Sequence, residues 1–165
     1  MKSLVEAIKE SCNKENKKRK LIKEAIHGVK PADEKLFWKW VADLGEYKII
    51  NVINKKEEDF YKKVADLGTT PEQFETFSDV FFTISNQFLD FLYDDDDVDM
   101  SDDGCEYASW NVPFYGETKV TSALKKKSTG LCDQYTGESV GYAMSSQEDY
   151  EEYLEDNKLE PKGYK

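Results

Sequence analysis

A run of phenylalanines at helical spacing constrains the fold of this chain more than any other feature. The run consists of Phe74, Phe77, Phe81, Ile84, Phe88 and Phe91. Its intervals of three and four residues place these side chains on one face of an α-helix. Phe82, Leu89 and Leu92 widen that face into a stripe of the kind that a helix turns toward a protein core. The spacing therefore predicts a long central helix over residues 72–93.

Capping residues mark the start of this helix. Thr70 is followed by Pro71, and Gln73 stands three residues after Thr70. A threonine at the N-cap and a glutamine three residues later form a capping box, and proline is favoured at the first helical position. An apolar seam of this width also suits a homodimer interface, so the oligomeric state stays open.

A nine-residue motif occurs twice before the central helix. Phe37–Gly45 and Phe60–Gly68 agree at seven of nine positions, 23 residues apart. Each copy predicts a short amphipathic helix whose final glycine takes the left-handed cap. The β-branched segment 47–53 fits either a helix or a strand. As a strand it would form a short β pair with the aromatic segment 107–115.

The C-terminal third predicts two more short helices. One contains Val120 and Leu124 and ends at lysines 125–127, where cations suit the helix dipole. The other is capped by residues 145–148 and carries Tyr150, Tyr153 and Leu154 on one side. We expect residues 157–165 to form a flexible tail.

These elements predict a mostly α fold, a single domain over residues 1–165 with six to seven helices. A chain of 165 residues is long enough to bury a substantial core. Residues 1–30 are predicted to form a basic, helical N-terminal segment. No apolar stretch suits a membrane span or a signal peptide, so we expect a cytoplasmic protein.

Positive and negative residues are distributed unevenly along the chain. Residues 1–63 hold 16 Lys or Arg and 11 Asp or Glu, whereas residues 64–165 hold 7 and 23. Residues 64–118 contain 14 Asp or Glu and no Lys or Arg. Eight of these acidic residues fall between residues 94 and 106. We interpret residues 94–106 as an acidic loop and expect any function of the negative charge to be local to it.

A basic protein is the first partner that this loop suggests. Acidic surfaces steer cationic partners, and aromatic side chains often anchor such interfaces. We expect a non-catalytic inhibitor or immunity-type protein, of phage or bacterial origin, that engages a nucleic-acid-binding protein or nuclease. Direct binding to nucleic acid is not expected at a net charge of −11. The predicted contact residues are Asp94, Asp95, Asp96, Asp97, Asp99, Asp102, Asp103, Tyr107 and Trp110.

Calcium is the alternative ligand of the acidic loop. In an EF-hand register that starts at Asp95, oxygen-ligand positions 1, 3, 5, 9 and 12 would be Asp95, Asp97, Asp99, Asp103 and Glu106. Met100 stands at position 6, where the sharp turn of the loop needs glycine. An intramolecular alternative pairs the basic stretch 14–20 with Asp94–Asp97.

Catalytic and zinc chemistry have few candidate residues. His27 is the only histidine, and Cys12, Cys105 and Cys132 are widely spaced. A zinc site would need all four to converge, so reduced thiols are the simpler interpretation. A small hydrolase of unspecified reaction is the second alternative function.

Several short motifs resemble an uncharacterised family of small bacterial domains. They are Phe37-Trp38, the helix start Thr70–Phe74, and Ser101-Asp102-Asp103-Gly104 followed by Tyr107, Trp110, Gly116 and Ala123-Leu124. The resemblance covers about residues 34–145. Cys105 stands where the family has an aromatic residue, and Pro113 interrupts the expected helix. The resemblance implies a mostly helical fold and no particular activity.

Overall fold

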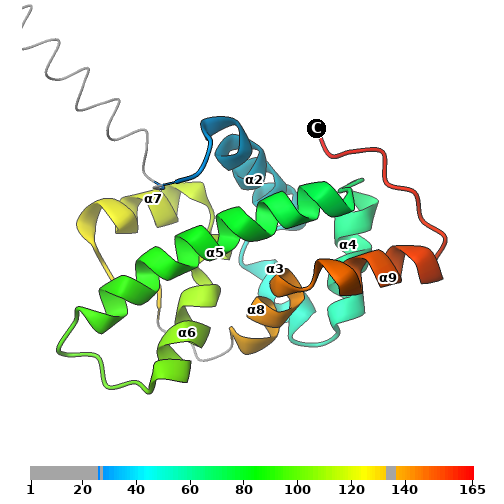
Figure 1. Cartoon of the computed structure of the whole chain (residues 1–165). Helices are drawn as coiled ribbons and strands as arrows, with labels where there is room; N and C mark the ends of the chain where they lie inside the picture. Colours follow the sequence, from blue (N-terminus) through cyan, green and yellow to red (C-terminus); the bar gives the residue numbers. More distant parts are fainter. Residues whose placement is uncertain (1–25, 27, 133–136) are drawn as a thin grey trace, which may run out of the picture.

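Helix α5, Pro71–Tyr93, crosses the molecule, and most of the other helices pack along it (Figure 1). The computed structural model describes residues 26, 28–132 and 137–165. The phenylalanine seam faces inward as predicted, and Phe74, Phe77, Phe81, Ile84 and Phe88 are fully buried. The capping box is formed too, because the Gln73 amide N–H donates to Thr70 Oγ1 and the Thr70 N–H donates to Gln73 Oε1, both at 3.3 Å.

Three helices precede α5 and five follow it in the described part of the chain. The first three are α2 (Pro31–Leu44), α3 (Lys48–Ile53) and α4 (Glu57–Asp66). After α5 come α6 (Asp102–Trp110), the 3-10 helix η1 (Val112–Tyr115), α7 (Glu117–Lys126), α8 (Glu138–Ser145) and α9 (Gln147–Asp156). The prediction of a mostly α helical bundle is confirmed.

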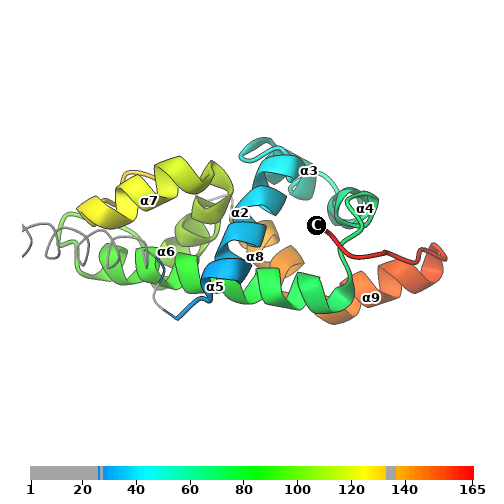
Figure 2. The same ribbon diagram turned by 90° about the horizontal axis from the view of Figure 1, so that it is seen from above.

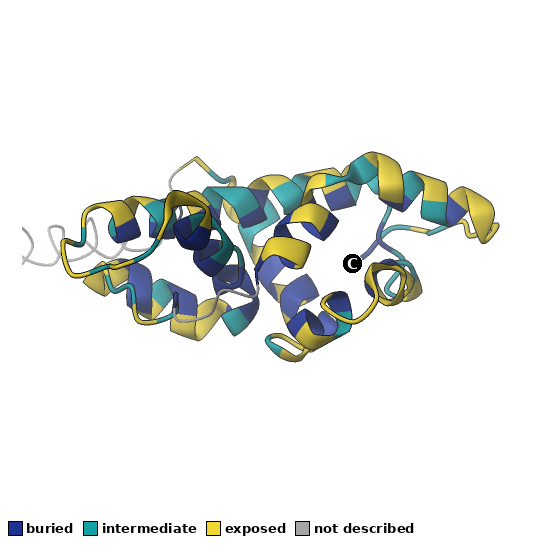
Figure 3. Ribbon diagram, turned by 90° about the horizontal axis from the view of Figure 1, so that it is seen from below, coloured by how far each residue is buried: buried dark blue, intermediate teal, exposed yellow. Residues whose placement is uncertain are grey.

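The other helices are arranged in three groups along α5. Figure 2 shows α6 and α7 beside the C-terminal half of α5, and α4 and α9 beside its N-terminal half. Helices α2, α3 and α8 fill the middle. The inward faces are buried along the whole length, whereas the outer faces are exposed (Figure 3). No helix among the described residues is long and apolar enough to cross a membrane.

The repeated motif forms the same helix end twice. In the first copy the N–H groups of Gly45 and Glu46 donate to the carbonyls of Ala42 and Val41, each at 3.0 Å. In the second copy Gly68 and Thr69 donate to Ala65 and Val64, at 2.8 and 3.3 Å. This is the Schellman arrangement. It needs a left-handed glycine, and φ is 100° at Gly45 and 78° at Gly68.

The expected β pair is not formed. Residues 48–53 are helix α3, and residues 107–115 belong to α6 and η1, so the described residues contain no strand. Ile49, Ile50 and Ile53 all point into the core from α3. Helical packing therefore overrides the β preference of the branched side chains in this segment.

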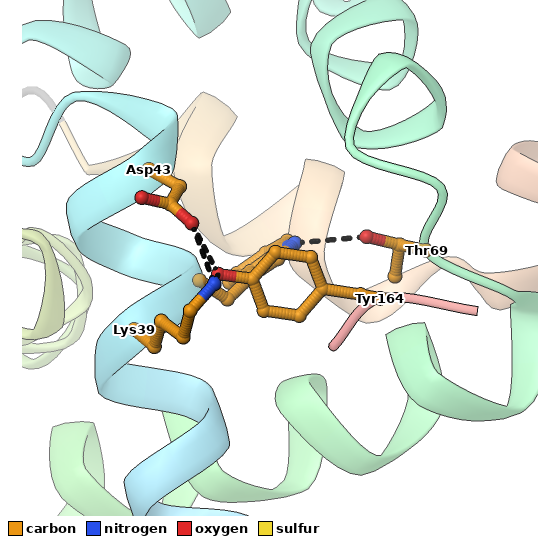
Figure 4. A network of polar contacts seen from close by, with 5 residues as sticks. Lys39, Asp43, Thr69 and Tyr164 are labelled. Atoms are coloured by element: carbon orange, nitrogen blue, oxygen red, sulfur yellow. Dashed lines mark hydrogen bonds and ion pairs between the residues drawn. The ribbon is translucent and has the colours of Figure 1, made fainter.

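The C-terminal segment is docked rather than free, which corrects the expectation of a flexible tail at residues 157–165. Tyr164 is only 6% exposed, and its N–H donates to Gln73 Oε1 at 2.7 Å. Its hydroxyl donates to Asp43 Oδ2 at 2.6 Å and accepts a hydrogen bond from Lys39 Nζ at 3.0 Å (Figure 4). The Gly163 N–H donates to the Gly68 carbonyl at 2.9 Å.

The basic N-terminal segment cannot be compared with its prediction. Of residues 1–30, only residues 26 and 28–30 are described, so the predicted helix lies outside the described residues. The same holds for the basic stretch 14–20, for Cys12 and for His27.

Candidate partner-binding surface

The acidic residues are carried by two adjoining elements at one end of α5. Asp94 is the C-cap of α5, and a turn then leads to Ser101, the N-cap of α6. The Ser101 hydroxyl accepts a hydrogen bond from the Gly104 N–H at 3.2 Å. The predicted acidic loop 94–106 is thus a loop only as far as residue 101.

The start of α6 changes the local electrostatics. Asp102 and Asp103 occupy the first turn of a helix, where the helix dipole favours negative charge. From the sequence alone these acids were expected in a loop, although the Ser-Asp-Asp run is itself a helix-start signal. The fold therefore stabilises part of the negative charge that it displays.

We call the eight carboxylates of this end the acidic face. They are Asp94, Asp95, Asp96, Asp97, Asp99, Asp102, Asp103 and Glu106. Six of them are exposed, and Asp95 and Glu106 are half-buried. Within the part of the chain that the structure describes, none of the eight has a Lys or Arg within 4.0 Å. The acidic face therefore presents charge that the described residues do not neutralise.

Asp95 has a structural role within the acidic face. Its Oδ2 accepts a hydrogen bond from Thr129 Oγ1 at 3.3 Å, which joins the loop to the segment after α7. Its Oδ1 accepts from the Asp97 N–H at 3.2 Å and closes a local turn. Asp95 therefore holds the loop in shape, while the side chains of Asp94, Asp96, Asp97 and Asp99 are left to solvent or a partner.

Four aromatic side chains lie on or beside α6, the helix that carries part of the acidic face, and we call them the aromatic edge. They are Tyr93, Tyr107, Trp110 and Tyr142. The Trp110 ring lies 5.3 Å from that of Tyr107 and 6.3 Å from that of Tyr142. Tyr93 and Tyr142 are 53% and 55% exposed. Tyrosine and tryptophan are the residue types that most often dominate binding energy at protein interfaces.

Burial and the neighbouring carboxylates raise the pKa of two tyrosine hydroxyls in the aromatic edge. Desolvation and then the Asp102 carboxylate raise the pKa of Tyr93, with smaller contributions from Glu106 and Asp103. Desolvation and then Glu138 raise the pKa of Tyr107. A tyrosine with the ordinary pKa of about 10 is already protonated at neutral pH, and the raised pKa values of Tyr93 and Tyr107 keep both hydroxyls able to donate hydrogen bonds.

Two glycines bring α8 against α6 and complete the aromatic edge. A Cβ at Gly137 would overlap the Tyr107 carbonyl, and a Cβ at Gly141 would overlap the Trp110 indole. Glycine at these two positions, one helical turn apart, lets the backbone approach closely. This contact sets Tyr142 and Glu138 beside Tyr107.

Most of this surface was predicted from the sequence, and one part was missed. Of the nine predicted contact residues, the seven aspartates Asp94–Asp97, Asp99, Asp102 and Asp103 lie at this end of the molecule. Tyr107 and Trp110 lie further along α6, and the Trp110 ring is 6.4 Å from that of Phe82 in the middle of α5. Tyr142 and Glu138 were missed because they lie more than 25 residues further along the chain. The spacing of Gly137 and Gly141 was the available signal. Two other nearby aromatics do not join the surface, since Phe114 is buried and Tyr115 packs on Tyr47.

The calcium-ligand pattern is not gathered into a site. Asp103 and Glu106 lie within α6, whereas Asp95, Asp97 and Asp99 lie in the preceding loop. In residues 28–132 and 137–165, no group of three His, Cys, Asp or Glu side chains could hold a metal ion. Calcium binding stays a prediction to which the described geometry adds no support.

Cys105 is a buried free thiol, and Cys132 is buried as well. Burial and then the Asp102 carboxylate raise the pKa of the Cys105 thiol, which disfavours the reactive thiolate. This environment suits core packing rather than nucleophilic chemistry, so the hydrolase alternative gains nothing from Cys105.

Comparison with known proteins adds no relative. No protein-family model, no curated protein and no solved structure matches this chain. The resemblance to small bacterial domains accordingly stays a prediction.

Proposed function

We propose that this chain is a non-catalytic binding protein that engages a basic protein through the acidic face, as an inhibitor or immunity-type protein does. The observation that carries the proposal is the set of eight carboxylates without a Lys or Arg partner among the described residues. Such a surface accelerates the association of a cationic partner and rejects anionic ones.

The aromatic edge supplies the second requirement of a stable complex. Charge on an exposed rim sets the association rate and specificity more than affinity, whereas desolvated aromatic anchors contribute most of the affinity. Tyr93 and Tyr142 are the most exposed aromatic side chains of the described residues. A partner that covers the acidic face would bury Tyr93, and one that also reaches α8 would bury Tyr142.

The partner class follows from the spacing of charge. Consecutive aspartates on a short loop present a dense array of oxygen anions, as a nucleic-acid backbone does. A protein that binds phosphates with clustered Lys and Arg can bind this array instead. A nuclease or another nucleic-acid-binding protein is therefore the proposed partner.

The test compares two variants with equal changes of charge. The acidic-face variant D94N/D96N/D97N/D99N keeps Asp95 and so retains the contact to Thr129. The control E75Q/D79N/E155Q/E160Q neutralises four exposed carboxylates elsewhere. A basic protein captured on the wild-type chain at low salt is purified and titrated against all three proteins by calorimetry.

We expect the acidic-face variant to bind at least about tenfold more weakly and the control to bind as the wild type does. Duplex DNA should compete with the chain for the partner. Equal weakening of both variants would show that only net charge matters and would overturn the proposal. Binding that high salt and DNA leave unchanged would overturn it as well.

A further inference from the structure

An acidic hollow is lined by residues of α4 and α9. Both helices lie beside the N-terminal half of α5, away from the acidic face (Figure 2). The volume of the hollow is about 610 Å³, and we call it the α4–α9 groove. It is lined by Glu58, Asp59, Tyr61, Lys62, Asp149, Glu152, Tyr153, Asp156 and Asn157. A hollow of this volume falls within the range of ligand-binding clefts.

The charge of the groove is negative and largely unpaired. Five carboxylates and one lysine line it. Lys62 is held by Asp66 at 2.7 Å, and Glu58 is held by Lys56 at 2.5 Å. The remaining four carboxylates, Asp59, Asp149, Glu152 and Asp156, form no ion pair within the described residues. An anionic ligand would be repelled, and a cationic ligand would meet four free charges.

Two neighbouring tyrosines, whose rings are tilted by 43° to each other, form the apolar part of the groove. The Tyr61 and Tyr153 rings lie 6.0 Å apart. Tyr61 is buried, and its hydroxyl donates to Glu57 Oε1 at 2.8 Å, which fixes the ring. Tyr153 is half-exposed. An aromatic face next to carboxylates binds ammonium and guanidinium groups through cation–π attraction as well as through ion pairing.

We infer that the α4–α9 groove binds a lysine- or arginine-rich peptide segment of another protein. Charge complementarity and the tyrosine lining argue for this occupant, because long basic side chains carry an apolar stem that covers a ring and a cationic head that reaches a carboxylate. The groove is separate from the acidic face. The inference therefore does not depend on the proposed function.

The test uses the full chain that already carries D94N/D96N/D97N/D99N, so that the acidic face keeps only four of its eight carboxylates. A fluorescein-labelled peptide of alternating lysine and alanine is titrated by fluorescence anisotropy at low salt. The groove variant adds D149N/E152Q/D156N to this background. The matched control adds E75Q/D79N/E160Q, three exposed carboxylates outside the groove.

We expect the groove variant to bind the peptide about tenfold more weakly, as the loss of three exposed ion pairs implies, and the control to change by less than about twofold. Tyr153→Leu should also weaken binding, whereas Tyr142→Leu should not. Equal loss in groove variant and control would overturn the inference, since it would show non-specific attraction.

The chain's own basic stretch 14–20 is the competing occupant. Zero-length carbodiimide cross-linking of the free chain, followed by mass spectrometry, tests it directly. Cross-links from these lysines to Asp149, Glu152 or Asp156 within one molecule would overturn the assignment to another protein. Cross-links from the added peptide to the same carboxylates would support it.

Discussion

At the scale of single residues, small side chains decide how closely the helices approach. Gly141 packs directly on the Trp110 indole, and Gly137 packs on the Tyr107 carbonyl. Neither glycine has a left-handed backbone, so both are needed for space and not for conformation. The position of Tyr142 at the aromatic edge depends on this contact.

We expect Gly141→Ala to destabilise the protein by about 1–3 kcal/mol, because the added methyl group has no room beside Trp110. Urea unfolding followed by tryptophan fluorescence measures the change. Gly130→Ala is the control, since a Cβ at Gly130 meets only the Ser128 hydroxyl at 3.4 Å. A wild-type stability for Gly141→Ala would contradict the close contact of α8 with α6.

At the scale of elements, the two copies of the repeated motif acquire different roles through the residue that comes after each cap. After the first Schellman cap, Glu46 is exposed at the chain reversal. After the second, Thr69 is fully buried, its Oγ1 accepts from Trp40 Nε1 at 3.0 Å, and its carbonyl accepts from the Tyr150 hydroxyl at 2.7 Å. Figure 4 shows the Thr69 contact beside the docked C-terminal segment.

The docking of this segment should depend on pH. Hydrogen bonds from Tyr164 and then Lys39 hold the pKa of Asp43 below its usual range, so the contact is present above the ordinary carboxyl pKa of about 4 and is lost as the pH falls through the lowered value. Hydrogen bonds to Tyr164 and then Asp43 raise the pKa of Lys39. That contribution is lost as the pH rises through the raised value.

Tyr164→Phe removes the hydroxyl and keeps the ring, so it reports this network. We expect it to melt at a lower temperature than the wild type at neutral pH, with the difference shrinking below about pH 4. Differential scanning calorimetry across pH measures the effect, and Tyr142→Phe on the exposed edge is the control. A difference that persists unchanged into strong acid would exclude the Asp43 contact.

At the scale of the whole molecule, negative charge is placed at both ends of α5. The acidic face lies at one end and the α4–α9 groove lies at the other. The aromatic core lies between them, and Figure 3 shows buried positions along the whole length. Concentrated like charge repels itself and lowers the stability of the compact state. This loss of stability is consistent with the proposal that the acidic face and the α4–α9 groove bind partners.

We expect D94N/D96N/D97N/D99N to raise the melting temperature at low salt, because it removes mutual repulsion among exposed carboxylates. The difference should fade near 1 M salt, where the screening length is about 3 Å. Thermal melts at both salt concentrations check this, with the quadruple control variant alongside. A lower melting temperature at low salt would mean that these four aspartates make stabilising contacts.

Local patterns in the sequence determined the elements of this fold. The phenylalanine spacing, the Thr70 capping box and the two glycine caps each act over a few residues, so the central helix and the repeated helix ends could be predicted. The acidic residues of the candidate site were equally visible, because they are close together in the chain. Strand and helix could not be separated at 47–53, since that choice depends on the surface against which the isoleucines pack.

Only the tertiary structure decided which distant segments meet. It placed Tyr142 beside Trp110, docked Tyr164 between α2 and α5, and opened an acidic groove between α4 and α9. These contacts join residues far apart in the chain, and the energy of each depends on burial and shape that no local pattern encodes. The sequence thus indicated one acidic surface, and the fold produced two.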